Sequence, residues 1–319
     1  MQNESGQKVE SMMAIDKYCI DKSILKGELR EQEPMSRHTS WKTGGVADYY
    51  FIHASITDLS ELLQQLPDKT PVVFVGKGSN LLVRDKGIKG VVISIEGVVN
   101  SFSQLTETIV EIGAGLACVK AARLSANIGL SGIEFLAGIP GTIGGALAMN
   151  AGAWGGETWT HVIQVKTINR SGIVKTYNSS EFKIGYRSVS IADNEWFISA
   201  QFELNPGDKN EIQDRIRDML DERANSQPLG QLSCGSVFRN PENDHAARLI
   251  EASGLKGHSI GGASVSDKHA NFIINNGDAS STDIENLINH VRNVVKQKYD
   301  VELIPEVKIM GETGSGEIA

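Results

Sequence analysis

Helical and strand-like spacings of apolar residues alternate along the first part of the chain. From Thr57 the leucines recur on one stripe at helical spacing, and Pro67 follows the end of that stripe. A second helical pattern covers residues 117–127, with Gly129 at the position where a left-handed residue commonly closes a helix. Short apolar runs without a helical period predict buried strands at 71–75, 81–83, 91–93 and 108–112.

The second half of the chain first favours strands and then helices. Apolar and polar residues alternate in a way that predicts strands at 161–169, 174–178 and 195–204. Residues 208–224 form an amphipathic helical pattern whose inward positions are Ile212, Ile216, Met219 and Leu220.

The last part of the chain predicts two more helices and two more strands. One helix is expected at 244–253, and a longer one follows the capping box formed by Thr282 and Glu285. The strands are expected at 271–274 and 301–304. Together with the earlier elements, this order predicts an α+β protein of two or three modules.

Composition divides the chain into five segments. The beginning of the chain is mixed and polar, so we expect a loosely docked extension, with ordered structure starting near Ser36. A turn-rich stretch at 225–235 marks a module boundary. The expected segments are an extension at 1–33, modules at 34–98, 99–225 and 226–310, and a tail at 311–319.

The charge balance excludes some classes of partner. The 319 residues contain 31 Lys and Arg against 39 Asp and Glu, a net charge of −8, which argues against broad binding to nucleic acid. A hydrophobic content of 40% is that of a folded protein rather than a disordered one. The composition is therefore that of a soluble folded protein, in which a local basic pocket remains possible.

Cysteine usage and the lack of a signal sequence point to the cytoplasm. Cys19, Cys118 and Cys234 are odd in number and far apart, so neither a disulfide framework nor a metal site is expected. The N-terminus has no apolar signal-peptide core. The uncharged run 135–156 is too rich in glycine to span a membrane.

Glycine is over-represented, with 33 residues in the chain. Two clusters, 76–78 and 113–115, directly follow predicted strands, and a third covers 138–156. Such clusters favour a phosphate-rich ligand lying along exposed backbone amides, although each could also be only a tight turn. The first cluster lacks the spacing of a Walker loop, and the second has Cys118 where the Rossmann fingerprint needs a small residue.

Several longer motifs occur in one order over 36–310 and together carry a resemblance to a known family. On these motifs the chain resembles the UDP-N-acetylenolpyruvoylglucosamine reductase (MurB) family of peptidoglycan-precursor enzymes. The motifs are TSWKTGG at 39–45, GKGSNLL at 76–82, GIPGTIGGALAMNAG at 138–152, GYRS at 185–188, GSVFRNP at 235–241, GLKG at 254–257, HANFIIN at 269–275 and PEV at 305–307.

The resemblance implies a fold and a reaction. The modules at 34–98 and 99–225 would form an FAD-binding fold of the vanillyl-alcohol-oxidase (PCMH) type, and 226–310 would be an α/β substrate-binding module. The reaction would be NADPH-dependent reduction of UDP-N-acetylglucosamine enolpyruvate to UDP-N-acetylmuramate. A hydride would pass from flavin N5 to the vinyl carbon, and the adjacent carbon would then be protonated.

The resemblance also assigns residues to a non-covalently bound FAD. The glycine-rich clusters would wrap its pyrophosphate and adenosine with backbone N–H groups, because a side chain there would hold the backbone away from the ligand. The cofactor-binding residues implied are Gly76, Lys77, Gly78, Ser79, Asn80, Gly113, Ala114, Gly115, Gly138, Pro140, Gly141, Thr142, Gly144 and Gly145.

Three residues match the family's catalytic positions. Arg187 would hold the substrate carboxylate, because a planar guanidinium suits a developing enediolate. Ser236 would donate the proton to carbon, and Glu306 would assist protonation or stabilise the intermediate. Each could instead be structural, as a surface ion pair, a turn serine or a solvated glutamate. Cys234, beside Ser236, is better explained as a packing residue than as a nucleophile.

The remaining expectations concern the substrate and the assembly. Arg223 and Asn240 match positions near the UDP-sugar, and Lys256 and His269 could contribute or be structural. Arg239 stands where the family often has lysine, and the chain resembles the subgroup that lacks a substrate-capping loop. We expect a monomer. Two alternatives are an FAD-dependent oxidase or dehydrogenase of a hydroxy acid or sugar, and a nucleotide-sugar or flavin binding protein without turnover.

Overall fold

The computed structural model describes residues 18–96 and 99–313. The first half of the predicted extension and the last six residues of the predicted tail lie outside the described residues.

The first module is a small mixed sheet covered by a helix. Its sheet has the order β1 (Glu28–Pro34), β2 (Val46–Ile52), β5 (Ile88–Ser94) and β3 (Val72–Val75). β1 pairs antiparallel with β2, and the other pairs are parallel. Helix α1 (Ile56–Gln65) begins at Ser55, whose side chain accepts from the backbone N of Asp58, and it buries the predicted leucine stripe against this sheet.

The expectation that ordered structure begins near Ser36 is wrong. β1 adds a complete edge strand before that residue, and Tyr18 and Ile20 are buried in the core of the first module. The sequence of β1 is mostly polar and only Glu33 in it is buried, because the strand pairs through its backbone at the edge of the sheet. Such a strand carries little apolar signal.

The second module is built on a five-stranded antiparallel sheet. The strand order is β12 (Val174–Asn178), β11 (Val162–Asn169), β15 (Glu195–Glu203), β7 (Ile109–Gly113) and β6 (Phe102–Gln104). Helices α2 (Cys118–Asn127), α3 (Ile143–Met149) and α4 (Lys209–Ser226) pack with this sheet around one apolar core. Gly129 has the left-handed φ of +72° that its predicted role after α2 requires.

Short paired strands complete the second module. β8 (Leu130–Ser131) pairs with β16 (Asn205–Pro206), β9 (Gly152–Ala153) pairs with β10 (Gly156–Glu157), and β13 (Lys183–Gly185) pairs with β14 (Ser188–Ser190). The β13–β14 hairpin presents Arg187 at its turn.

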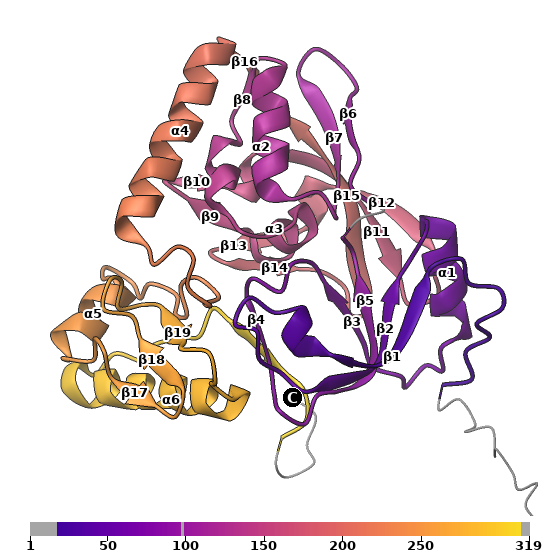
Figure 1. Cartoon of the computed structure of the whole chain (residues 1–319). Helices are drawn as coiled ribbons and strands as arrows, with labels where there is room; N and C mark the ends of the chain where they lie inside the picture. The colour runs from indigo at the N-terminus through magenta and orange to yellow at the C-terminus, as the bar shows by residue number, and fades with distance from the viewer. Residues whose placement is uncertain (1–17, 97–98, 314–319) are drawn as a thin grey trace, which may run out of the picture.

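The third module follows α4 and packs two helices on a small sheet (Figure 1). Its elements are α5 (Ala246–Ala252), β17 (Ser259–Ile260), β18 (Ala263–Val265), β19 (Ile273–Asn275), α6 (Ser281–Tyr299) and β20 (Lys308–Met310). β17, β18 and β19 form an antiparallel sheet, whereas β20 leaves the module to pair with β4 (Leu81–Val83) of the first.

Two predictions in this module are wrong. Residues 301–304 form no strand, because Leu303 is buried in the core while the neighbouring Ile304 is 57% exposed and only its carbonyl is paired, with Arg239 N. Helix α6 is capped by Ser280 with Asp283 rather than by Thr282 with Glu285. The Thr282 hydroxyl donates to Asp85 of the first module instead.

The first and third modules are joined through their cores. Trp41 is fully buried in the core of the third module, where its indole N–H donates to Ile273 O at 2.8 Å. The Asn275 amide returns a bond to Trp41 O at 2.7 Å, and Arg84 pairs with Glu285 at 3.0 Å. Figure 1 shows β4 and β20 side by side at this junction. The third module is therefore held against the first, near the glycine loop after β3.

Across residues 18–96 and 99–313, every helix is too short or too polar to traverse a bilayer.

Candidate active site

Arg187 is held rigidly at the turn of the β13–β14 hairpin. Its backbone has a left-handed φ of +53°, uncommon for a residue other than glycine. Its guanidinium donates to Gly152 O at 2.6 Å and to Asn150 O at 3.4 Å. The neighbouring Tyr186 ring lies over the guanidinium, 5.0 Å from its carbon to the ring centre. In this fixed orientation the Nε–H faces Glu306 of the third module.

Glu306 is the residue that Arg187 faces. The Arg187 Nε lies 3.5 Å from Glu306 Oε2, and the two side chains are only 17% and 19% exposed. The pair joins the second module to the end of the third, so it depends on how the modules pack.

Ser236 belongs to the segment that pairs with Glu306. The backbone N of Glu306 donates to Val237 O at 2.7 Å, and Phe238 forms an isolated bridge with Pro305. The buried Asn271 side chain clamps Phe238 by accepting from its N at 3.0 Å and donating to its O at 2.8 Å. Ser236 is therefore one residue away from the direct partner of Glu306, on a braced backbone.

Electrostatics at Glu306 are set by burial and two arginines. Burial raises the pKa of the Glu306 carboxyl above its usual value of 4.5, and the positive charges of Arg187 and Arg239 oppose that rise. A carboxyl that holds its proton more tightly than usual is better suited to proton transfer than an ordinary glutamate. The site thus combines a fixed guanidinium with a carboxyl of raised pKa, beside the segment that carries Ser236.

Cys234 has the packing role that the sequence favours. It is buried, and its thiol contacts Gly78 O and Leu81 O at 3.7 and 3.5 Å. Burial raises its pKa to about 12, so no reactive thiolate forms near neutral pH. The contact to Gly78 also ties the segment before Ser236 to the glycine loop.

The three predicted glycine clusters meet in one place. A Cβ on Gly76 would lie 2.4 Å from the Thr142 hydroxyl, and one on Gly144 would lie 3.0 Å from Ala114 Cβ. The backbone N of Gly144 donates to Ala114 O at 2.8 Å. Segments from three parts of the sequence therefore form one continuous surface.

Within that surface the glycines serve two different needs. Gly78, Gly113 and Gly115 are buried, and a Cβ on each would collide with a backbone carbonyl, so these glycines allow loops to pack on each other. A Cβ on Gly141 or Gly145 would meet nothing closer than 3.4 Å, which leaves room for a ligand to approach the backbone.

The loop after β3 supplies unpaired donors for such a ligand. Within the described part of the chain, none of the backbone N–H groups of residues 77–80 donates to a protein acceptor. Successive free amides in a turn form a concave site that favours an anion. The residues present therefore fit the pyrophosphate of the FAD that the resemblance implies.

The four predicted substrate-binding residues lie in different surroundings. Asn240 lines an open hollow of about 550 Å³ together with Tyr186, and its side chain accepts from Ala246 N at 3.1 Å. Arg223, at the end of α4, donates to Gln227, and burial lowers its pKa.

Lys256 and His269 remain apart from the Arg187–Glu306 pair. Lys256 pairs with Glu251 at 2.8 Å, and His269 accepts from Asn271 N and packs edge-on against Phe272. Burial lowers the pKa of His269. No contact among the described residues links either side chain to Arg187 or Glu306.

Two residues that support the site, Asn150 and Arg239, were not predicted from the sequence to do so. Asn150 is fully buried with a left-handed φ of +44°, and its amide donates to Glu157 and to Gly185 O, so it ties the end of α3 to the Arg187 hairpin. Its place at the end of the glycine-rich motif was the available signal. Arg239 was noted only as a departure from the family, yet its guanidinium donates to Arg187 O at 3.2 Å.

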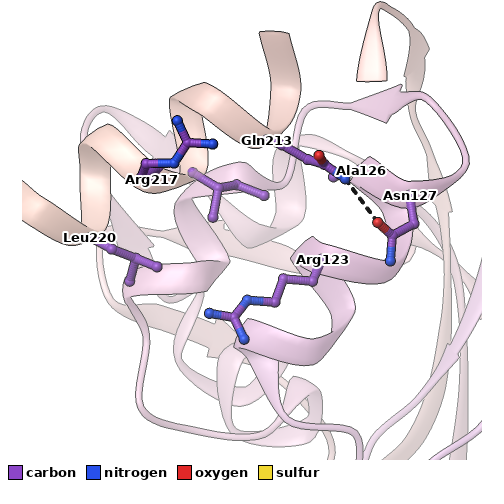
Figure 2. A pocket seen from close by; sticks show the side chains of 7 residues that line it. Arg123, Ala126, Asn127, Gln213, Arg217 and Leu220 are labelled. Atoms are coloured by element: carbon purple, nitrogen blue, oxygen red, sulfur yellow. Dashed lines mark hydrogen bonds between the residues drawn. The ribbon is translucent and has the colours of Figure 1, made fainter. Parts of the chain in front are cut away.

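A second hollow lies away from this chemistry. It measures about 320 Å³ and lies between α2 and α4, where the amide of Gln213 donates to Asn127 at 2.9 Å (Figure 2). Its lining contains none of the predicted site residues.

Two family models match separate parts of the chain. Residues 227–310 match the C-terminal domain of UDP-N-acetylenolpyruvoylglucosamine reductase, and residues 47–178 match an FAD-binding domain. A UDP-N-acetylenolpyruvoylglucosamine reductase of Alkalilimnicola ehrlichii is 50% identical over 93% of this chain and 99% of the relative. One of Legionella pneumophila strain Lens is 48% identical over 95% of this chain and 98% of the relative.

A solved structure shows the same fold. The crystal structure of the UDP-N-acetylenolpyruvylglucosamine reductase (MurB) of Thermus caldophilus matches with a TM-score of 0.77 and 29% identity, over 89% of this chain and 99% of that one. The predicted α+β architecture, with an FAD-binding part and a C-terminal module, is confirmed. The chain belongs to the UDP-N-acetylenolpyruvoylglucosamine reductase family and is an FAD-dependent oxidoreductase.

Proposed function

We propose that this protein reduces the enolpyruvyl ether of UDP-N-acetylglucosamine to UDP-N-acetylmuramate, with NADPH as the reductant. One observation carries the proposal: the Arg187–Glu306 pair lies beside the segment that holds Ser236, although these residues come from distant parts of the chain. The names of the half-identical relatives support the same substrate.

The glycine surface would hold the cofactor. The free amides of residues 77–80 would bind the FAD pyrophosphate, and the open backbone at Gly141 and Gly145 would lie against the rest of the nucleotide. FAD held there would supply, in its reduced form, the hydride for the terminal vinyl carbon of the substrate. Gly113 and Gly115 would support this surface from behind.

Arg187 would bind the substrate carboxylate. When the vinyl carbon accepts a hydride, negative charge develops on the adjacent carbon and spreads into the carboxylate. A guanidinium already fixed by two backbone carbonyls stabilises that charge without reorganising. The substrate carboxylate would compete with Glu306 for the Arg187 Nε–H.

Ser236 would deliver the proton to the adjacent carbon. A hydroxyl is a weak acid, but a carbanion-like centre is a strong enough base to accept its proton when the two atoms are aligned. Glu306, whose pKa is raised by burial, would assist this transfer from the neighbouring strand-like segment. Asn240 and Arg223 would contact the UDP-sugar, while Lys256 and His269 are weaker candidates.

The test is NADPH consumption by the purified protein with and without UDP-N-acetylglucosamine enolpyruvate. We expect oxidation of NADPH that depends on this substrate and yields UDP-N-acetylmuramate. A flavin-containing protein that consumes no NADPH with this substrate would exclude the proposed reaction. The monomeric state and the cytoplasmic location stay predictions.

A further inference from the structure

Arg239 connects the two halves of the site. Its backbone N donates to Ile304 O at 2.9 Å, two residues before Glu306. Its guanidinium donates through Nη2 to Arg187 O at 3.2 Å. One residue therefore contacts both the segment that carries Glu306 and the hairpin turn that carries Arg187.

The guanidinium of Arg239 is placed at a cost to stability. Its Nε is buried and has no hydrogen-bond partner among the described residues. A buried donor without a partner is unfavourable, because it has lost its bonds to water and gained none in the protein. An apolar side chain would avoid this penalty. The presence of arginine at this position must therefore be explained by the effects of its charge and of its Nη2 hydrogen bond.

The contact acts on a strained turn. Arg187 has φ of +53°, a conformation that L-residues other than asparagine and aspartate rarely adopt. Its carbonyl oxygen is the acceptor of the Arg239 bond. Fixing that peptide favours the one turn conformation in which the Arg187 side chain reaches Gly152 O and Glu306.

We propose that Arg239 is a positioning residue for reduction of the sugar substrate: it locks the turn that presents Arg187 to Glu306. This inference rests on the proposed function, because it assigns Arg239 to the step in which Arg187, Ser236 and Glu306 act.

The positive charge of Arg239 lowers the pKa of the Glu306 carboxyl. Arg187 on its hairpin and Arg239 on the segment after Ser236 are the charged groups that act on Glu306, and both oppose the rise in its pKa that burial causes. Removing the charge of Arg239 leaves one opposing cation, so the pKa of Glu306 moves further up. A limb of the pH–rate profile that reports the titration of Glu306 moves to higher pH together with this pKa. The direction is the same whether the reaction needs Glu306 protonated or ionised.

Two substitutions separate charge from geometry. Arg239→Met removes both, and Arg239→Lys keeps the charge but loses the planar fork. We expect Arg239→Met to slow oxidation of the reduced flavin by the sugar substrate about 100-fold, within the range for a misaligned proton-transfer site. We expect Arg239→Lys to lose about tenfold in rate and to keep the wild-type pH profile. Reduction of the flavin by NADPH stays unchanged in both variants.

The control variants distinguish the specific effect of Arg239 from the effect of losing any arginine. Arg217→Met removes an exposed arginine of α4 that pairs with Asp214, so it leaves both half-reactions unchanged. Glu306→Gln abolishes the pH limb that Arg239→Met shifts. If Arg239→Met fails to fold by circular dichroism, Arg239→Gln, which keeps a polar donor without charge, replaces it.

A direct titration keeps this inference distinct from the reaction itself. Carbon-13 NMR of the Glu306 carboxyl, identified by its loss in Glu306→Gln, needs no sugar substrate. We expect its midpoint to lie higher in Arg239→Met than in the wild type and in Arg239→Lys. Folded Arg239→Met with an unmoved midpoint and wild-type rates would overturn the inference, whereas lack of turnover by the wild type would overturn only the proposed function.

Discussion

The glycine surface and the charged centre solve the problem of ligand binding in opposite ways. Residues 76–80, 113–115 and 138–145 are rich in glycine, so their backbones pack closely on one another. The backbone amides of residues 77–80 are left free to bind a ligand. At the Arg187–Glu306 pair the protein brings two charged side chains together, each four-fifths or more buried, beside the segment of Ser236. The first region binds by backbone shape and the second by placed charge.

This difference determines how each region tolerates change. A backbone surface fails when a single methyl group enters it, because the neighbouring carbonyls cannot move independently. A charged centre keeps its fold when one side chain is shortened, but it loses the chemistry that depended on that side chain. Substitutions in the first region should therefore affect folding and flavin content, and those in the second should affect reaction steps.

The largest effect is expected for Gly78→Ala. Gly78 has φ of +57°, and a Cβ there would lie 1.9 Å from His38 O, so the loop must rearrange. We expect a loss of about 2 kcal/mol or more in the free energy of unfolding, measured by urea denaturation, and loss of bound flavin.

Gly145→Ala is the matched control for this substitution. A Cβ at Gly145 meets only Thr142 Oγ1, at 3.7 Å, so the fold should be kept or gain about 0.5–1 kcal/mol from the better helix former in α3. A drop in flavin content alone would place the ligand at Gly145. Equal stability of the wild type and Gly78→Ala would contradict the close-packing interpretation of the loop.

The next largest effect is expected for Ser236→Ala. Loss of the proton donor should slow oxidation of the reduced flavin by the sugar substrate roughly 10²–10⁴-fold, as for other general acids. Reduction by NADPH should keep its wild-type rate, because it needs no proton from this hydroxyl. Stopped-flow absorbance of the flavin separates the two steps, and equal slowing of both would show that Ser236 is structural.

Arg187→Lys should have a somewhat smaller effect on the same step. Lysine keeps the charge but cannot reproduce the three directions in which Arg187 contacts Gly152 O, Asn150 O and Glu306. We expect a loss of about 10²–10³-fold in the oxidation step, the scale for a lost oxyanion donor. A rate within a few-fold of the wild type would show that only charge is needed there.

The smallest effect is the pH dependence of stability that arises from Glu306. Its pKa in the folded protein lies above 4.5, so the folded state holds this proton more tightly than the unfolded state does. The contribution of Glu306 to stability is therefore present below pH 4.5 and is lost as the pH rises through the folded pKa, with a slope of at most ~1.4 kcal/mol per pH unit. Urea unfolding across this pH range should show the slope in the wild type and its absence in Glu306→Gln. An identical pH dependence in the two proteins would contradict the raised pKa.

The predictions that succeeded depended on local patterns. The leucine stripe of α1, the C-terminal glycine after α2 and the amphipathic face of α4 all follow from residues a few positions apart. The predictions that failed were decided by partners far along the chain. Thr282 would be a suitable cap for a helix, but Asp85 takes its hydroxyl, so α6 begins two residues earlier at a Ser280 cap.

The sequence by itself determined most of the α-helices but not α3, some of the strands, the glycine loops and, through its motifs, the family of this protein. Those features depend on spacing along the backbone, which the chain specifies directly. Only the tertiary structure decided that Arg187, Glu306 and the segment of Ser236 meet, that Arg239 braces the turn, and which glycines pack against protein. Burial of a charge and contact between modules depend on the whole packed molecule, and no local pattern encodes them.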